Sequence, residues 1–486
     1  MQLSTDDINR RITDYLAANW DTMLADFATL VEIPSVEDLA AADPAANAPF
    51  GPEPARALDA ALAIAGRMGL QTVNHEGYIG TADMPGASAT QIGIIGHVDV
   101  VPAGPGWHFE PYQMTRQDGY LIGRGTTDDK VPLLTALHAV NLWREIAADQ
   151  GEALPYTIRV MFGANEETDM KDVAYYRARN ADPAFLFTPD AEFPVSYGEA
   201  GILHGEFASA PIEDGLIVQI EGGTAVNAVP GQAFAIVRAD ANALRSNDAH
   251  ITIVDAGIND QGAPLTRIDV QGKSAHASTP ELGVSAIRVL IDFLLMNDLC
   301  TYAEKQFLML MRAFMRTTNG AGLNIQCADD HFGALTAVGG VIKLEAANDA
   351  TRIVQSIDVR YPTCTNAEKI AEEIERYTDI IDARFTVLHN KEPFLLDPQS
   401  PAVQALLEAY REATGETDAQ VFTMKGGTYA RCFTTAASFG PEKPWEETPD
   451  WMGGMHGPDE GASEASVKEA FRIYALTIGK LMQLDL

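Results

Sequence analysis

The stretch "QIGIIGHVDVV", residues 91–101, constrains the fold more than any other part of the chain. Its apolar positions are mostly Ile and Val, which is typical of a strand inside a sheet. Yet His97 and Asp99 stand within the run, where an ionisable group without a partner loses its water at high cost. Residues two apart on a strand face the same side. The stretch therefore predicts a polar site on one face of a buried strand.

Length and charge narrow the possibilities further. The 486 residues exceed one ordinary core, so we expect two domains. The 34 Lys and Arg against 68 Asp and Glu give a formal net charge of −34. Such a surface repels phosphate backbones, so we do not expect a nucleic-acid partner. The same charge lowers the cost of assembling a site for metal cations.

The sequence offers no sign of a membrane partner. It has no apolar run of about 18 residues, which a membrane span would need. The first residues, "MQLSTDDINRRITDYLAANW", are acidic and polar and lack the basic head and apolar middle of a secretory signal. We therefore expect a cytoplasmic location, and a helix that starts with Ser4 or Thr5 as its N-cap.

The cysteines limit the kind of metal site. The four in the chain are far apart and form no C-x-x-C pair: Cys300, Cys327, Cys364 and Cys432. A disulfide framework and a thiolate zinc site are both unexpected. Any metal ion would need histidine and carboxylate ligands.

The pattern of predicted helices and strands changes twice along the chain. Helical and strand-like patterns alternate over residues 1–200, which is typical of an α/β domain. Residues 201–390 are richer in strand-like segments and hold two helical patterns, and an α/β pattern returns over 391–486. We predict one discontinuous α/β catalytic domain, with a mixed sheet flanked by helices, and an inserted α+β lid domain in its middle.

Acidic residues and histidines recur at the apparent ends of strands or in glycine-rich loops. Each has an ordinary structural explanation when it is taken alone, such as a helix N-cap or a solvated face. Together they predict a ligand site, because α/β sheets bind ligands at the carboxyl ends of their strands. The set comprises His97, Asp99, Asp128, Asp129, Glu166, Glu167, Asp190 and His456.

The succession of these motifs resembles a known family. His-x-Asp, then Gly-Arg-Gly-x-x-Asp-x-Lys, Glu-Glu, Asp and a late His is similar to the co-catalytic zinc metallopeptidases that include glutamate carboxypeptidases, aminoacylases and succinyl-diaminopimelate desuccinylase. "GGTAVNAVPGQA", "GKSAHASTPELGVSA", "KGGTYAR" and "MHGPDE" resemble the bacterial dipeptidase V (carnosinase-like) group within it. The resemblance spans nearly the whole chain and implies a zinc-exopeptidase-like catalytic domain.

The resemblance implies a role for each motif residue. It implies that His97, Asp128 and Asp190 hold one metal ion and that Asp128, Glu167 and His456 hold the other. Glu166 is then the general base, and Asp99 orients the ring of His97. The ions are expected to be zinc, with manganese or cobalt as alternatives, because histidine and carboxylate ligands suit all three. The chain departs from the family at Val131, where glycine is usual, and we expect only a small effect on the turn.

The resemblance also implies residues that contact a substrate. His276 stabilises the oxyanion, and Arg360 binds a free carboxylate as a two-pronged fork. Asn227 assists one or the other, and Gly427 and Thr428 offer further donors. On the sequence alone, His276 is an ordinary loop histidine and Arg360 a structural arginine. Insert residues that act on chemistry held by the other domain imply closure over the substrate.

Three functions remain open from the sequence. The first is a metal-dependent dipeptidase for short peptides with a free carboxylate, which the large insert favours. The second is an amidase for N-acyl amino acids, which would use the same metals and base. The third is a non-catalytic binding protein, which the presence of Glu166 beside the full ligand set disfavours. We expect a small peptide as the partner and a monomeric chain, with a homodimer as the alternative.

Overall fold

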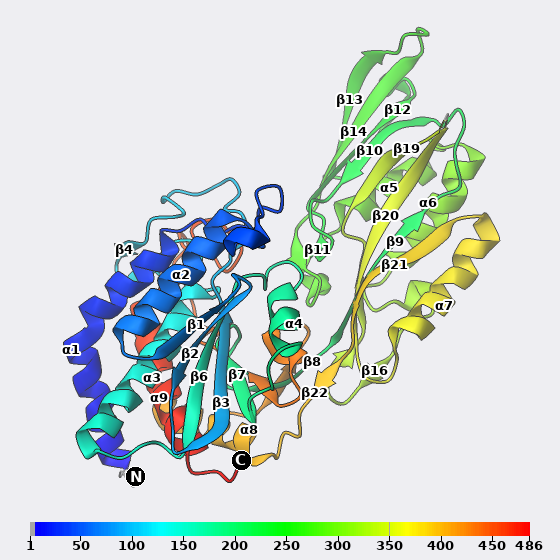
Figure 1. Ribbon diagram of the computed structural model, residues 1–486. Coiled ribbons are helices and arrows are strands. Elements are labelled where there is room, and N and C mark those ends of the chain that lie inside the picture. Colours follow the sequence, from blue (N-terminus) through cyan, green and yellow to red (C-terminus); the bar gives the residue numbers. More distant parts are fainter. Residues whose placement is uncertain (1–4, 349) are drawn as a thin grey trace. The chain divides into compact units, whose positions relative to one another are not determined.

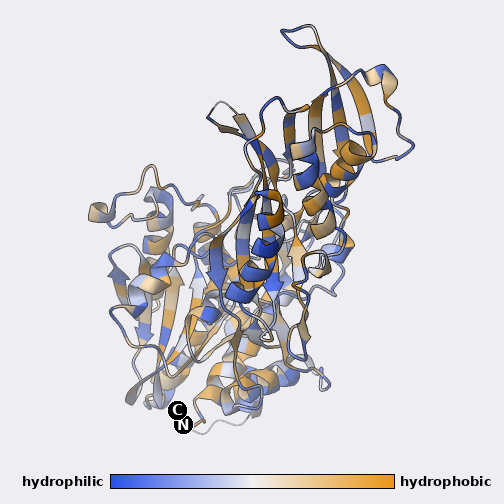
Figure 2. Cartoon of the chain, turned by 90° about the vertical axis from the view of Figure 1, so that its right-hand side faces the viewer, coloured by the Kyte–Doolittle hydropathy of each residue, from blue (hydrophilic) through white to orange (hydrophobic). Residues whose placement is uncertain are grey.

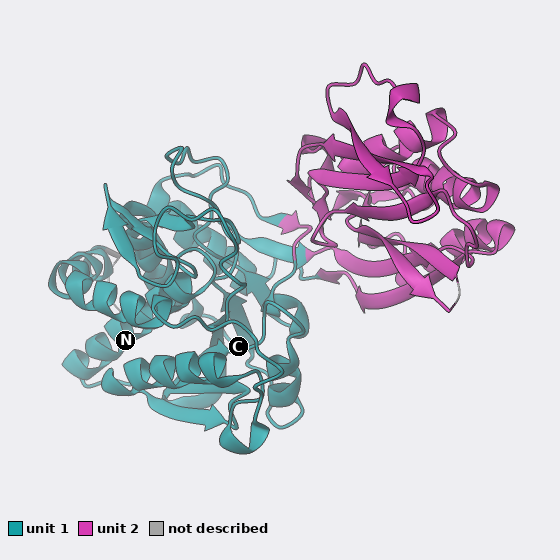
Figure 3. Ribbon diagram, turned by 90° about the horizontal axis from the view of Figure 1, so that it is seen from above, with its two compact units in different colours: residues 1–198, 395–422, 427–486 teal, residues 199–394, 423–426 magenta. Residues whose placement is uncertain are grey.

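The computed structural model describes residues 5–348 and 350–486 and divides them into two compact units. Unit 1 contains residues 1–198, 395–422 and 427–486, and unit 2 contains residues 199–394 and 423–426 (Figure 3). Each unit has its own hydrophobic core. A mixed α/β unit interrupted by a second unit confirms the predicted fold class.

Unit 1 is built on a mixed sheet in the order β1-β2-β6-β3-β7-β24-β8-β22, with β23 paired to β8 (Figure 1). Four neighbours, β6, β3, β7 and β24, run parallel, whereas β1 and β2 are antiparallel. The strands are β1 Gln71–His75, β2 Ile79–Met84, β3 Ser88–His97, β6 Tyr156–Gly163, β7 Phe185–Thr188, β8 Ser196–Glu199, β22 Phe394–Leu395, β23 Phe422–Met424 and β24 Ala436–Ser438; a separate small sheet holds β4 Thr115–Gln117, β5 Tyr120–Ile122 and β25 Gly461–Ser463.

Helices flank the sheet of unit 1. They are α1 Thr5–Val31, α2 Pro52–Arg67, α3 Lys130–Gln150, α4 Lys171–Arg177, α8 Pro401–Thr414 and α9 Glu464–Leu481. Helix α3 packs against α1, α9 and β3. It is buried nearly all round over its first four turns, as its mostly apolar sequence indicates. Even Lys130 is buried, and its Nζ donates to the carbonyls of Leu30 and Ile33, at 2.9 and 2.7 Å, which ties the end of α1 to α3.

Unit 2 is an antiparallel sheet covered by three helices. The strand order is β13-β14-β12-β10-β19-β20-β9-β21, with β18 on β20. The helices carry hydrophobic and hydrophilic sides, and their apolar residues belong to the unit's core (Figure 2). The elements are β9 Gly201–Ala208, β10 Ile217–Gly222, β11 Ala228–Val229, β12 Gln232–Arg238, β13 Ile251–Ile258, β14 Pro264–Gln271, β15 Ala275–His276, β16 Ala328–Asp329, β17 Gly333–Ala334, β18 Thr336–Val338, β19 Ile342–Ala347, β20 Ala350–Tyr361, β21 Arg384–Lys391, α5 Ala286–Met296, α6 Tyr302–Phe314 and α7 Ala367–Thr378.

The predicted strand over 91–101 is wrong at its end. Strand β3 stops at His97, so Asp99 lies in the following loop and not on the strand. The backbone N–H of Val98 still donates to Gly163 of β6, but that of Val100 donates to Ser35, outside the sheet. The apolar residues after His97 are buried by this loop and not by strand pairing. The proposed N-cap Ser4 lies outside the described residues, and α1 begins at Thr5.

Within the described part of the chain, no helix is long and apolar enough to cross a membrane. The four cysteines are free thiols.

Gly163 provides a test of the packing that ends β6. A Cβ added there would lie 2.0 Å from Oη of Tyr429. We expect Gly163→Ala to reduce the free energy of unfolding by about 1–3 kcal/mol, because a packed core resists added volume. Gly66→Ala in α2 is the control, since its Cβ would meet nothing closer than 4.0 Å, and alanine favours the helix. Urea unfolding measures the stability of both variants. Equal unfolding midpoints for Gly163→Ala and Gly66→Ala would contradict the close packing of Tyr429 against Gly163.

Candidate metal centre

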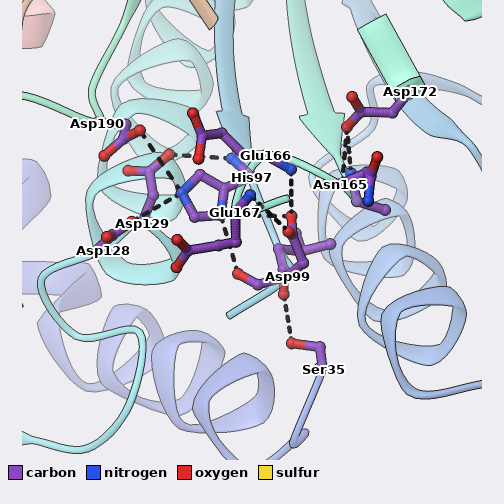
Figure 4. A network of polar contacts seen from close by, with 12 residues as sticks. Ser35, His97, Asp99, Asp128, Asp129, Asn165, Glu166, Glu167, Asp172 and Asp190 are labelled. Carbon is purple, nitrogen blue, oxygen red and sulfur yellow. Dashed lines mark hydrogen bonds and ion pairs between the residues drawn. The ribbon is translucent and has the colours of Figure 1, made fainter. Parts of the chain in front are cut away.

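Three of the predicted ligands lie at or just beyond the carboxyl ends of neighbouring parallel strands. His97 ends β3, Glu167 follows β6, and Asp190 follows β7. Asp128 lies just before α3, and His456 lies in the loop before β25. Parallel strands bring their carboxyl ends to one edge of the sheet, which explains why residues distant in sequence meet there. Figure 4 shows several of these side chains pointing toward one another around His97.

Asp128 lies between the two histidines. Its Oδ1 is 2.8 Å from Nε2 of His97, and its Oδ2 is 2.9 Å from Nε2 of His456. Each carboxylate oxygen therefore faces a different imidazole. A carboxylate in this position can give one oxygen to each of two metal ions.

The remaining acids divide between the two sides of Asp128. Glu167 Oε2 is 3.1 Å from Nε2 of His456, whereas Asp190 Oδ2 is 3.7 Å from Nε2 of His97. Ligand atoms of His97, Asp128 and Glu167 lie within 4.8 Å of one another, and so do those of His97, Glu166 and Asp190. The structure thus brings together all five predicted ligands and places Glu166, the predicted base, among them.

The centre concentrates negative charge away from water. Burial, together with the nearby charge of Asp128, raises the pKa of Asp190 to about 8. Burial and the charge of Asp190 raise the pKa of Glu166 well above its usual value. Burial alone would lower the pKa of His456, but its hydrogen bonds to Asp128 and Glu167 raise it to about 11. The carboxylates therefore compete for few positive partners.

These residues fit a pair of divalent cations. Glu166 Oε1 is buried and has no hydrogen-bond partner among the described residues. Buried carboxylates that are left unpaired are costly, and bound cations remove that cost. Histidine nitrogens and carboxylate oxygens are also the donor set that zinc and manganese accept. The centre therefore has the charge and the ligand types of a metal site.

The predicted role of Asp99 takes a different form in the structure. Its carboxylate Oδ1 is 3.5 Å from Nδ1 of His97, whereas its backbone carbonyl is closer, at 3.0 Å. The carboxylate instead accepts the backbone N–H groups of Glu166 and Glu167, at 3.2 and 3.1 Å. Asp99 thus positions the loop that carries these two glutamates as well as the ring of His97.

A second buried carboxylate holds the beginning of the same loop. Asp172 Oδ2 accepts the backbone N–H groups of Ala164 and Asn165, at 2.8 and 3.0 Å, and the hydroxyl of Tyr429. Four consecutive backbone N–H groups, residues 164–167, therefore donate to two carboxylates. Such bonds fix a loop far more firmly than contacts to water.

Glu460 holds the loop before Asp128 in the same way. Its Oε1 accepts the backbone N–H groups of Gly125, Thr127 and Asp128, at 3.0, 2.9 and 3.2 Å. Its Oε2 pairs with the buried guanidinium of Arg124, which also donates to the carbonyl of His456. The loops that carry two ligands are thereby joined.

Three further acids, Glu460, Asp172 and Asp129, support the centre without having been predicted as metal ligands. Glu460 stands in the quoted "MHGPDE", but nothing in the letters shows that it caps another loop. Asp172 is in the first turn of α4, where an acid is ordinary. Asp129 accepts the backbone N–H of His97 at 3.1 Å, so it supports the centre beside the predicted ligand Asp128.

Three of the predicted substrate residues belong to unit 2. Asn227 and His276 lie on neighbouring segments of unit 2. Ala228 pairs with His276, and the Asn227 carbonyl accepts the N–H of Ala277 at 2.9 Å. Arg360 is buried in β20, where Nε and Nη2 donate to Asp358 and Nη1 donates to a backbone carbonyl. Three of the five guanidinium N–H donors are thus engaged by other described residues.

Gly427 and Thr428 belong to unit 1. Thr428 is buried, and its hydroxyl accepts the backbone N–H of Ala430 and lies 3.1 Å from Oγ of Ser438. These contacts cap the short 3₁₀ helix Tyr429–Cys432. The hydroxyl that was predicted to bind substrate therefore has a structural task in the loop.

Fold and site together define a hydrolase-type centre with the ligands for paired metal ions. The model of peptidase family M20/M25/M40 matches residues 93–480. A β-Ala-Xaa dipeptidase of Lactobacillus delbrueckii subsp. lactis is 31% identical over 439 residues, which cover 87% of this chain and 89% of that protein. The chain therefore belongs to peptidase family M20/M25/M40 and is a peptidase.

Solved structures share the fold. The dipeptidase Dug1p of Saccharomyces cerevisiae aligns with a TM-score of 0.58 at 14% identity, covering 98% of this chain and 99% of that chain. Human carnosine dipeptidase 1 aligns with a TM-score of 0.57 at 13% identity, with the same coverage. The family resemblance read from the motifs is confirmed.

Asp128 provides a test of the metal centre. Because each of its oxygens faces a different histidine, we expect Asp128→Asn to reduce bound metal from two ions per chain to fewer than one. Elemental analysis after dialysis against zinc measures the content. Asp118→Asn, on the exposed turn between β4 and β5, is the control and should retain both ions. Full metal content in the Asp128 variant would refute the bridging role.

Proposed function

We propose that this protein hydrolyses dipeptides that carry a free C-terminal carboxylate, with two zinc ions as its cofactor. The observation that carries the proposal is Asp128, with one carboxylate oxygen toward each histidine and Glu166 beside it. The similarity to a β-Ala-Xaa dipeptidase over most of both chains supports the substrate class. Manganese and cobalt also suit the donor set.

Glu166 is the proposed general base. When bound, the two cations supply Lewis-acid activation of the water and the scissile carbonyl. The Oε1 atom of Glu166 has no partner among the described residues, so it is available to a water molecule at the centre. Glu166 takes a proton from the attacking water and passes it to the leaving amine. Asp99 holds its backbone N–H and thus keeps the carboxylate in place.

Residues of unit 2 are proposed to bind the rest of the substrate. Arg360 retains two N–H donors that can hold a carboxylate as a fork. His276 is exposed, with Nδ1 2.7 Å from Oγ of Ser278, and is the proposed donor to the oxyanion. Asn227 lies on the segment that pairs with that of His276, and it is proposed to help bind the oxyanion or the carboxylate.

Removing the base should separate turnover from metal binding. We expect Glu166→Gln to retain both metal ions and to lower kcat by about 100- to 10,000-fold, the range for loss of a general base. Glu167→Gln is the comparison, because it should lose metal content as well as activity. Elemental analysis and steady-state rates measure both. Wild-type rates in the Glu166 variant would exclude its role as the base.

A substrate panel distinguishes a dipeptidase from an amidase of N-acyl amino acids. We expect release of free amino acids from Ala-Gly, Leu-Gly and β-Ala-His, with N-acetylated counterparts cleaved at least about tenfold more slowly. Ninhydrin-type assays of the zinc-loaded protein measure the products. Preference for the N-acetyl compounds would favour the amidase, and no hydrolysis of either series would favour a binding protein.

Arg360 should affect substrate affinity. We expect Arg360→Met to raise KM for dipeptides at least about tenfold, since hydrogen bonds to charged groups contribute roughly 1.5–3 kcal/mol. Arg360→Lys should restore only part of the affinity for dipeptides, because an ammonium group cannot bind a carboxylate with two parallel N–H groups. Arg352→Met, on the same strand β20, is the control. An unchanged KM in both Arg360 variants would refute carboxylate binding.

A further inference from the structure

Unit 1 holds a cavity beside the metal centre. Its volume is about 250 Å³, which is below the roughly 300–1,000 Å³ of pockets that enclose drug-sized ligands and closer to the size of one amino-acid side chain. Thr127 and Met455 line it, and each directly precedes a metal ligand in the chain, Asp128 or His456. The cavity therefore borders the two loops that carry these ligands.

The walls of this cavity are chiefly apolar. Val131, Val467 and Ala470, from α3 and α9, supply hydrocarbon surface. The hydroxyl groups in the wall are mostly bonded within the protein: Thr126 to Gly123, Thr127 to Gly461, Thr135 to Val131, and Ser463 to Ser466. These hydroxyl groups are thus occupied, and the cavity favours an apolar guest.

One charge in the wall has no partner. Lys443 pairs with Glu469 and Glu446, so these charges offset one another. The carboxylate of Glu442 has neither a hydrogen bond nor an ion pair among the described residues, although it is half-buried and lines the cavity. A carboxylate that is partly buried without a partner is costly. A cationic ligand would relieve this site.

The backbone fixes where Glu442 stands. It follows β24, the fourth parallel strand, as Glu167 and Asp190 follow β6 and β7. Its N–H donates to the carbonyl of Ala191, and its carbonyl accepts the N–H of Phe193. Glu442 is therefore held alongside the segment that supplies Asp190, at the edge of the sheet where the ligands gather.

We propose that Glu442 binds the α-ammonium group of the substrate's N-terminal residue, and that the cavity holds the side chain of that residue. The inference rests on the proposed dipeptidase function. A dipeptide presents an apolar or small side chain and a cation on one carbon, next to the scissile carbonyl. The cavity presents apolar walls and one unpaired carboxylate beside the metal centre, so the two are complementary. An N-acyl amino acid lacks the ammonium group and gains nothing from Glu442.

A pair of ligands that differ only in the amino group tests this proposal. Leu-Gly is the substrate, and 4-methylpentanoyl-glycine, the same molecule without its amino group, is the competitive inhibitor. We expect Glu442→Gln in the zinc-loaded protein to raise KM for Leu-Gly at least about 30-fold, as expected when a partly buried charge loses its partner. The inhibition constant of 4-methylpentanoyl-glycine should change less than about threefold.

Glu192→Gln is the matched control. Glu192 is also half-buried and pairs with Glu442 through the backbone, but it does not line the cavity. The Glu192→Gln substitution should leave the KM for Leu-Gly and the inhibition constant of 4-methylpentanoyl-glycine within about threefold of the wild-type values. Equal weakening of both ligands in the Glu442 variant, or no weakening, overturns the role of Glu442. A wild-type protein that cleaves no dipeptide overturns the proposed function itself, which is a different outcome.

The cavity is tested separately with side chains of increasing size. For the wild-type protein, we expect kcat/KM to rise from Gly-Gly through Ala-Gly to Leu-Gly and to fall for Trp-Gly, which exceeds the space. Val467→Phe should lower the ratio of kcat/KM for Leu-Gly over Gly-Gly at least about tenfold, because it fills the cavity. If kcat/KM of the wild-type protein does not depend on the size of the N-terminal side chain, this part of the proposal is overturned.

Discussion

The structure depends on how unit 1 tolerates several carboxylates in one buried place. Asp128, Glu166, Glu167 and Asp190 share two imidazoles, so the like charges are compensated only in part by the protein itself. Any arrangement of this kind raises the energy of the folded chain unless cations enter it. Metal binding and the stability of unit 1 are therefore linked, since ions that bind the folded state shift the unfolding equilibrium.

The metal ligands keep their positions because other carboxylates fix the loops that carry them. Asp172 and Asp99 take four consecutive N–H groups of the loop 164–167, and Glu460 takes three of the loop before α3. These three acids accept backbone N–H groups, and Glu460 also pairs with Arg124, so their role is to position the loops. The centre thus has two kinds of acid, one for positioning and one for cations, in close proximity.

Much of this could be predicted from the sequence. The strand 156–163 and the long helix after Asp129 have clear patterns, and the order of the motifs indicated the ligands through its resemblance to a known family. Loop contacts were beyond such reasoning. Asp172 looks like an ordinary acid at a helix start, and Asp99 looks like a strand residue. Their true partners are backbone N–H groups of another loop, which have no signature in the letters.

The insertion of unit 2 has a consequence for synthesis of the protein. All but four residues of unit 2 form one continuous stretch, 199–394, so its sheet can assemble as that stretch leaves the ribosome. Unit 1 cannot, because β24, α9 and His456 come from the last part of the chain. The acidic edge of its sheet lacks its final strand and its second histidine until residues beyond the stretch 199–394 have been synthesised. The order of synthesis thus places the assembly of the metal centre after that of the unit 2 sheet.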